Sequence, residues 1–272
     1  MDDAPVALVT GAARGLGAAV AAALDAAGFR LVLTDIAVDG RPADPAASND
    51  QAHDPVPTYP LSTRAELEAV AAGRRQAVAV RADVREQGEL DAAAAVALRE
   101  FGRLDVAVAV AGVIAGGQPL WETGDDTWRA VNAVDLDGVF HLVRATLPAI
   151  RTAPAGRFVA VSSAAGTRGL YGLAAYCAAK HGVIGLVRGL AADLVGTRVT
   201  ANVVCPGSMD TTMLAETARI YGLDGVTSFA DHALQRRLLD PAEVAAAVAW
   251  LCSPAAGAVT GTVFPVDAGF QG

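Results

Sequence analysis

Seven short apolar segments alternate with alanine-rich stretches along this chain of 272 residues. Each segment is apolar throughout instead of alternating with polar residues, a pattern typical of parallel strands that are buried on both faces. The segments predicted as strands are Pro5–Thr10, Arg30–Asp35, Gln76–Val80, Leu104–Ala109, Gly156–Ser162, Arg198–Val204 and Gly261–Val266. Because strands and helices in this order imply right-handed crossovers, the sequence predicts an α/β fold with one doubly wound, seven-stranded parallel sheet.

Helix start signals agree with this alternation. Thr63 and Glu66 have the spacing of a capping box, and Asp240-Pro241-Ala242-Glu243 combines an N-cap, a proline in the first turn and an acidic residue. We find no internal repeat and no interdomain linker, so residues 1–272 are predicted to form a single domain. Residues 38–60 hold five of the chain's thirteen prolines and are predicted to be a long insertion, either a functional lid or a disordered loop.

The composition excludes several classes of protein. The formal charge is −8 and no basic run occurs, which argues against nucleic acid or an anionic membrane as a partner. Three cysteines are too few for a disulfide framework, and neither they nor the four histidines have metal-ligand spacing, so no metal site is predicted. An acidic N-terminus that leads into a strand, with no apolar run of membrane-spanning length, predicts a soluble, cytoplasmic protein.

A glycine-rich loop, Thr10-Gly11-Ala12-Ala13-Arg14-Gly15-Leu16-Gly17, follows the first predicted strand and opens a helix. Glycines let the backbone approach a pyrophosphate, whose charge is met by free amides and the positive end of the helix, as in Rossmann-type domains. Asp35 ends the second strand, where a carboxylate accepts hydrogen bonds from a ribose 2′-hydroxyl and repels a 2′-phosphate. Arg14 could bind that phosphate instead, but an unpaired carboxylate facing a phosphate costs more, so NAD is the predicted cofactor.

Ser163, Tyr176 and Lys180 are the candidate catalytic residues. Lys180 is the only lysine beside 20 arginines, and it lies four residues after Tyr176 on a predicted helix, so the two side chains share a face. A nearby ammonium is expected to lower the pKa of the Tyr176 phenol and make it a general acid–base. Ser163 can donate a hydrogen bond to a substrate oxygen that gains alkoxide character. The alternative is a buried tyrosine with a lysine that packs beside it and a turn serine.

With these residues, the chain resembles the short-chain dehydrogenases/reductases over essentially its whole length. Further matches are Asp83-Val84, Pro206-Gly207-Ser208-Met209-Asp210-Thr211 and Val266-Asp267-Ala268-Gly269-Phe270. The resemblance implies one dinucleotide-binding catalytic domain, in which Lys180 also contacts the nicotinamide ribose and Met209 and Thr211 hold the carboxamide and a phosphate. The cofactor-binding residues expected from motif and resemblance together are Gly11, Arg14, Gly15, Leu16, Gly17, Asp35, Ile36, Asp83, Val84, Ala109, Ala111, Gly112, Tyr176, Lys180, Pro206, Gly207, Met209 and Thr211.

Two positions depart from the family pattern. Ala109-Val110-Ala111-Gly112 replaces the family's Asn-Asn-Ala-Gly, which loses amide hydrogen bonds. Asp135 aligns with the asparagine that holds a water in the family's proton relay to lysine. A carboxylate there could still hold the water but would partly offset the field of Lys180 at Tyr176. Asp135 is therefore kept as a candidate catalytic residue, with Asn132 as an alternative ligand of the water.

The insertion adds a narrower resemblance. Asp35-Ile36, the insertion itself, Tyr59-Pro60-Leu61-Ser62-Thr63 and a following Glu-Leu helix look like the mycofactocin-associated branch of the family. In that branch an insertion covers the NAD, which does not exchange freely and needs an external redox partner. The resemblance thus implies tightly held NAD that is recycled by mycofactocin. The alternative is a disordered surface insertion.

The expected substrate lid spans residues 208–240, after the Pro-Gly turn. The residues expected to offer apolar contacts are Met213, Leu214, Ile220, Tyr221 and Phe229, with Leu170 and Tyr171. No arginine cluster suggests a phosphorylated or acyl-carrier substrate, unless Arg168 or Arg219 faces the pocket. We therefore expect a compact apolar alcohol or ketone, and an NAD-dependent oxidoreductase that interconverts a secondary alcohol and a ketone.

Two alternative functions stay open at this point. One is a freely exchanging NAD(H)-dependent 3-oxoacyl or carbonyl reductase, and the other is a non-catalytic NAD-binding regulator. The predicted helices at Asp125–Arg151 and Ala174–Leu194 are rich in alanine and glycine. Because the family usually forms dimers or tetramers through these helices, the resemblance implies a homo-oligomer, and we expect a homotetramer.

Overall fold

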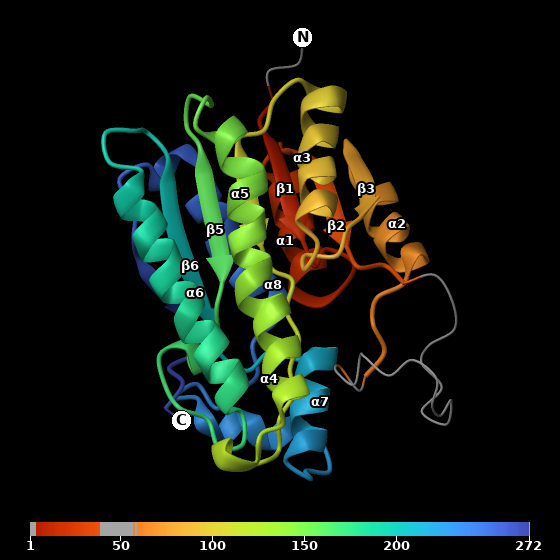
Figure 1. Cartoon of the computed structure of the whole chain (residues 1–272), viewed down its shortest axis with the longest axis vertical. Helices are drawn as coiled ribbons and strands as arrows, with labels where there is room; N and C mark the ends of the chain where they lie inside the picture. The colour runs from red at the N-terminus through yellow and green to blue at the C-terminus, as the bar shows by residue number, and fades with distance from the viewer. Residues whose placement is uncertain (1–3, 39–56, 58, 272) are drawn as a thin grey trace.

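The computed structural model describes residues 4–38, 57 and 59–271. Seven strands among these residues form one parallel sheet in the order β3-β2-β1-β4-β5-β6-β7 (Figure 1). Their bounds are Val6–Thr10 (β1), Arg30–Asp35 (β2), Ala77–Arg81 (β3), Val106–Ala109 (β4), Arg157–Val161 (β5), Thr200–Pro206 (β6) and Val263–Val266 (β7). The strand order changes direction between β1 and β4, and ligands of such sheets bind beyond the carboxyl ends of the strands at this point.

Helices cover both faces of the sheet. The helices are α1 (Gly15–Ala26), α2 (Arg64–Ala72), α3 (Gln87–Phe101), α4 (Asp125–Asn132), α5 (Gly138–Ile150), α6 (Ala174–Asp193), α7 (Thr212–Ile220) and α8 (Pro241–Cys252). Apolar side chains of α1, α2 and α8 pack on one face, and those of α3, α5 and α6 pack on the other. Figure 1 shows α5 and α6 in front of the sheet, with α4 and α7 beyond the ends of the strands. This three-layer arrangement confirms the predicted fold class.

All seven predicted strands are present, and their bounds differ from the predicted ones by at most two residues. The predicted capping box is present at Thr63–Glu66 before α2. The predicted N-cap Asp240 is also present before α8, where it forms a capping box with Glu243. The helix predicted over Asp125–Arg151 is present as a continuous helical stretch over 125–150, but it is not α-helical throughout. A π-helical segment, η2 (Ala133–Asp137), separates α4 from α5. Such a segment widens one helical turn, which no hydrophobic period reveals, and π-helical turns are frequent at functional sites.

Most of the predicted insertion, residues 39–56 and 58, lies outside the described residues. The two described ends of the insertion meet beside the end of β2, where the Val38 amide donates to the Ser62 carbonyl and Val38 forms a β-bridge with Thr63. Within the part of the chain that the structure describes, no helix has both the length and the apolar character needed to cross a membrane. The same residues hold no cluster of three or more histidine, cysteine, aspartate or glutamate side chains suited to a metal ion.

Candidate active site

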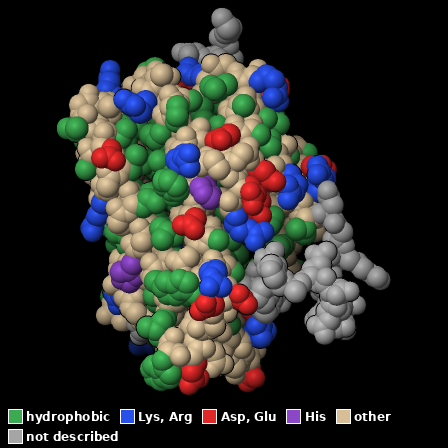
Figure 2. Space-filling model, viewed as in Figure 1, with side chains coloured by type: hydrophobic (Ala, Val, Ile, Leu, Met, Phe, Trp, Pro, Cys, Tyr) green, Lys and Arg blue, Asp and Glu red, His purple; other side chains and the backbone are tan. Residues whose placement is uncertain are grey.

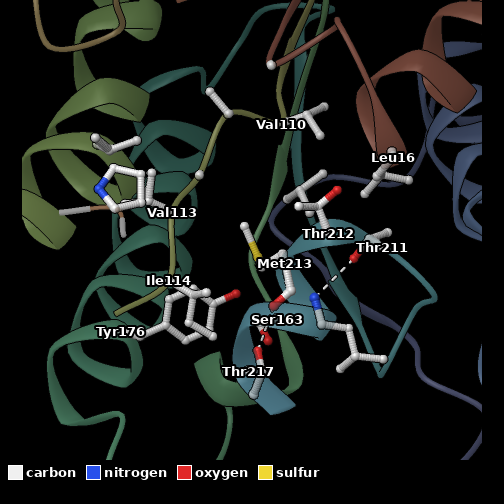
Figure 3. A pocket seen from close by; sticks show the side chains of 18 of the residues that line it. Leu16, Val110, Val113, Ile114, Ser163, Tyr176, Thr211, Thr212, Met213 and Thr217 are labelled. Carbon is white, nitrogen blue, oxygen red and sulfur yellow. Dashed lines mark hydrogen bonds between the residues drawn. The ribbon is translucent and has the colours of Figure 1, made fainter. Parts of the chain in front are cut away.

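A cavity of about 930 Å³ opens at the carboxyl ends of the strands, where the strand order changes direction. Its wall combines the glycine loop, the ends of β2 to β6 and the segment 208–240, and Figure 3 shows Leu16, Ser163, Tyr176 and Thr211 around it. Every residue predicted to bind the cofactor lines this cavity except Ala109. Ala109 is buried within β4, and its neighbour Val110 reaches the wall instead.

The glycine loop has the shape that a pyrophosphate requires. Gly11 and Gly15 have φ values of +66° and +53°, which favour glycine, and a Cβ on Gly17 would lie 1.9 Å from the Gly11 carbonyl oxygen. The loop therefore folds closely onto the start of α1. No side chain caps that helix at Arg14 and its first turn holds no acidic residue, so its amides remain for an anion.

Asp35 lies at the end of β2 on the cavity wall. One carboxylate oxygen accepts the Ala13 amide at 3.0 Å, and the other accepts the Ile36 amide at 2.9 Å and the Ser62 hydroxyl. A carboxylate offers about four acceptor positions, so these partners orient Asp35 and still leave room for a ribose hydroxyl. The residues of the loop and of Asp35 thus fit a dinucleotide without a 2′-phosphate.

The segments that follow β3 and β4 also line the cavity. Burial raises the pKa of Asp83, but hydrogen bonds from Arg85, with a salt bridge of 2.7 Å, outweigh burial and hold that pKa below its usual value. At the end of β4, the Val110 and Ala111 amides donate to the Thr10 hydroxyl at 3.2 and 3.3 Å. These contacts anchor the segment although the family's two asparagines are absent.

The three candidate catalytic residues meet on one side of the cavity. Tyr176 and Lys180 lie on the same face of α6, both almost fully buried, with the Lys180 Nζ 5.5 Å from the centre of the Tyr176 ring. Ser163 follows β5, and its hydroxyl accepts the Ala165 amide at 3.1 Å. The Ser162 hydroxyl donates to the Lys180 carbonyl at 2.8 Å, which ties α6 to the end of β5. The arrangement places a phenol, a hydroxyl and an ammonium around one point.

The expected lowering of the Tyr176 pKa is wrong as a net effect. Burial raises the pKa of Tyr176 above its usual value, and this is the largest contribution. The Lys180 ammonium and a hydrogen bond with Ser163 act to lower the pKa, whereas the Asp135 carboxylate acts to raise it. Sequence spacing could place the ammonium near the phenol, but the degree of burial depends on the tertiary fold.

Asp135 does not line the cavity but lies behind Lys180, with no exposed surface. Its Oδ2 is 3.2 Å from the Lys180 Nζ, and its Oδ1 accepts the Val113 amide at 2.7 Å. The prediction that a carboxylate here would oppose the field of Lys180 agrees with the direction of its effect on Tyr176. The amide of Asn132, the alternative ligand of the relay water, donates to the Trp128 carbonyl within α4.

The other end of the cavity is apolar. Met213, Leu214, Tyr221, Phe229, Leu170 and Tyr171 line it as predicted, whereas Ile220 does not. The Thr217 hydroxyl donates to the Met213 carbonyl (Figure 3). The Tyr221 hydroxyl donates to the Tyr171 carbonyl, so both hydroxyls are used within the protein.

Arg168 and Arg219, which would favour a phosphorylated or acyl-carrier substrate if they faced the cavity, do not line it. Arg168 packs over the Phe270 ring at 5.7 Å, and Arg219 pairs with Glu216 at 2.6 Å. His232 and Phe270 line the wall and were not predicted. An antiparallel bridge between Ala233 and Phe270 brings these distant segments together, and no local sequence signal marks it.

Comparison with known proteins identifies the family. A family model described as Enoyl-(Acyl carrier protein) reductase matches residues 54–271. An uncharacterized oxidoreductase of Mycobacterium tuberculosis (strain CDC 1551 / Oshkosh) is 40% identical to the chain, over 97% of this chain and 95% of its own length. The (-)-trans-carveol dehydrogenase of Rhodococcus erythropolis is 34% identical over 97% of this chain and 96% of its own. The chain belongs to the short-chain dehydrogenase/reductase family.

A solved structure agrees with this assignment. The crystal structure of carveol dehydrogenase from Mycobacterium avium in complex with NAD aligns with a TM-score of 0.86 and 30% identity, over 97% of this chain and 96% of that one. As a member of the family, the protein is an oxidoreductase, and the cavity at the strand ends is its candidate active site.

One further feature of this short-chain dehydrogenase/reductase is the segment Tyr59–Thr63, which begins at the end of the predicted insertion and lines the cavity. The Tyr59 hydroxyl accepts the Ile114 amide at 3.3 Å, and burial raises the pKa of this phenol. The Arg14 guanidinium donates to the Pro60 carbonyl, and the Ser62 hydroxyl donates to Asp35. The segment is therefore attached to the cofactor end of the cavity and to the strand end near Tyr176.

Proposed function

We propose that this protein is an NAD-dependent dehydrogenase that interconverts a secondary alcohol and the corresponding ketone. The observation that carries the proposal is that Ser163, Tyr176 and Lys180 lie on the wall of the same cavity as the glycine loop and Asp35. The carboxylate at Asp35 supports NAD over NADP because it would repel a 2′-phosphate. The relative from Mycobacterium avium, whose structure contains NAD, supports the same cofactor.

NAD, when bound, supplies the hydride acceptor. Tyr176 takes the proton of the alcohol hydroxyl during oxidation and returns it to the carbonyl oxygen during reduction. Ser163 donates a hydrogen bond to the same oxygen, and this bond strengthens as negative charge develops there. Lys180 stays an ammonium ion beside Tyr176 and stabilises the phenolate. The Ala165 amide and the α6 backbone hold these groups in place before the substrate arrives.

The walls of the cavity favour a compact apolar substrate. The hydroxyls of Thr217 and Tyr221 are bonded to backbone carbonyls, and Arg219 is paired with Glu216. Such an apolar surface binds a substrate mainly by excluding water, and it provides few polar or cationic groups for a phosphate or an acyl carrier. The name of the Rhodococcus erythropolis relative, (-)-trans-carveol dehydrogenase, is consistent with an alcohol substrate.

We further propose that the NAD is tightly held beneath the segment Tyr59–Thr63 and is recycled by mycofactocin. Support comes from the contacts of this segment with Arg14 of the glycine loop, with Asp35 at the predicted ribose position and with Ile114. These three partners come from different strand ends, so a bound dinucleotide could leave only after several contacts break. A freely exchanging reductase is the rival, and its cofactor would be lost on dialysis.

We also propose a homotetramer that forms through α4, α5 and α6. Trp128 on α4 and Phe140 on α5 are partly exposed aromatic side chains. Figure 2 shows hydrophobic side chains among scattered charges over the face formed by α5 and α6. Aromatic side chains in such positions are typical of subunit interfaces.

Extensive dialysis followed by denaturation tests the proposed retention of NAD. We expect the wild-type protein to release NAD, not NADP, and to oxidise cyclic secondary alcohols when an artificial electron acceptor, without added NAD, regenerates the cofactor. Ser62→Ala, which removes the bond to Asp35, is expected to lose its nucleotide faster, whereas Ser253→Ala at the end of α8 serves as the control. An empty wild-type protein that turns over only with added NAD would support the exchanging reductase.

A further inference from the structure

Asp135 and Lys180 form a buried ion pair directly behind the candidate active site. The Asp135 Oδ2 lies 3.2 Å from the Lys180 Nζ, with exposed side-chain fractions of 0% and 5%. A surface pair at this distance would be screened by water and salt, but a pair without solvent contact keeps most of its interaction. Whatever charge this pair presents is therefore felt at Tyr176, whose ring centre is 5.5 Å from the same Nζ.

The surrounding backbone fixes the carboxylate in this position. The π-helical segment η2 carries Asp135 into the interior, and the Val113 amide donates to its Oδ1 at 2.7 Å. Gly112 at the end of β4 lies against the pair, because a Cβ there would be 3.3 Å from the Lys180 Nζ and 3.5 Å from the Asp135 Oδ1. The carboxylate is thus enclosed by α6, η2 and the segment that follows β4, and its side chain has no exposed surface.

We propose that Asp135 is a positioning residue that partly offsets the charge of Lys180 at Tyr176, so that Tyr176 keeps its proton to higher pH than it would beside Lys180 alone and acts as a base mainly under alkaline conditions. This inference rests on the proposed role of Tyr176 in proton transfer. A protonated Tyr176 is ready to donate its proton to a ketone, and the rate of alcohol oxidation should increase with pH.

The other titratable groups near the three residues do not replace this effect. The groups that act on Tyr176, Lys180 or Asp135 besides one another are Tyr59, Cys177 and Cys205. Burial raises the pKa of each of these three groups, so they stay neutral near pH 7. Among the described residues, the charges that decide the state of Tyr176 are therefore those of Lys180 and Asp135.

The direction of the effect on Lys180 agrees with this balance. Burial alone would lower the pKa of Lys180, but the interactions with Asp135 and Tyr176 raise it above its usual value. Removing the negative charge of Asp135 should therefore lower the pKa of both Lys180 and Tyr176. Whichever of Lys180 and Tyr176 releases its proton first, that proton is lost at a lower pH in the variant than in the wild type.

Asp135→Asn tests the proposal without the need for turnover. The tyrosinate absorbance of Tyr176 is obtained as the difference between a protein and the same protein with Tyr176→Phe. We expect the midpoint of this titration to fall by at least ~1 pH unit in Asp135→Asn. The exposed Asp137→Asn, two residues away on the same segment, is the control and should leave the midpoint unchanged. The pH profile of kcat/KM for alcohol oxidation should shift by the same amount as the absorbance midpoint.

Lys180 allows a second readout because it is the only lysine of the chain. Lysine labelled at the ε position gives a single NMR signal to follow with pH. In the wild type we expect Lys180 to remain an ammonium above pH ~10.4, the usual lysine value, and in Asp135→Asn to titrate at lower pH. A wild-type lysine that titrates below this value, or equal tyrosinate midpoints in the wild type and Asp135→Asn, would overturn the inference. If the midpoints shift but no alcohol is oxidised, the proposed function fails and the electrostatic role of Asp135 stands.

Discussion

Tyr176→Phe is expected to lower kcat/KM for alcohol oxidation by ~10²- to 10⁴-fold, the usual contribution of a general acid–base. The phenol hydroxyl is the group that exchanges a proton with the substrate oxygen, and phenylalanine keeps the ring but not the proton. Because the ring packs with Val113, Ile114 and Leu173 in an apolar cluster at the cavity wall, the variant should keep its fold.

The measurement is dye-coupled oxidation of a panel of cyclic secondary alcohols over a range of pH. Two controls separate chemistry from folding, namely the unfolding temperature and the amount of nucleotide released on denaturation, and both should match the wild type. A Tyr176→Phe protein that oxidises alcohols at the parent rate would contradict the assigned role.

Lys180→Met should cost about 3 to 5 kcal/mol of unfolding free energy at neutral pH, because it leaves the Asp135 carboxylate buried without a cationic partner. Burial already raises the pKa of Asp135, and loss of Lys180 raises it further. The folded variant then binds a proton that the unfolded chain releases near pH ~3.9. Since the folded state binds more protons, its stability falls as pH rises from the unfolded pKa to the folded pKa. The penalty should therefore be small in acid and grow as pH rises through the folded pKa of Asp135.

The double variant Lys180→Met with Asp135→Asn provides the matched comparison. It removes the buried carboxylate together with its partner, so most of the lost stability should return at neutral pH, while activity stays low. Denaturant unfolding of the wild type, the single variant and the double variant at acidic, neutral and alkaline pH measures this difference. Equal stability of the single and double variants at every pH would show that burying the Asp135 carboxyl group without Lys180 costs no stability, which would contradict this prediction.

The sheet and the catalytic face could be predicted because local patterns encode them. Apolar runs without alternation identify strands buried on both faces, and the spacing of Tyr176 and Lys180 places them on one face of α6. The glycine loop could be recognised because its conformation depends on residues next to one another in the chain.

Other features depend on contacts between distant segments, which local patterns do not encode. The π-helical turn at Asp135 shifts the helix by one residue without a change in hydrophobic pattern. The net rise in the pKa of Tyr176 follows from burial under several elements. His232 enters the cavity wall through a bridge between Ala233 and Phe270, and Ser62 reaches Asp35 only because the two ends of the insertion meet.

The most direct test of the account follows the fate of the carbinol hydrogen. Protein that has been dialysed without added nucleotide is mixed with secondary alcohols deuterated at the carbinol carbon and is then denatured. The mass of the released nucleotide is determined by mass spectrometry. The account predicts NADH that carries one deuterium from the wild type and unlabelled NAD from Tyr176→Phe. The account would be contradicted if the protein released NADP. It would also be contradicted if the wild type released only unlabelled NAD after every alcohol, whether or not NAD was supplied.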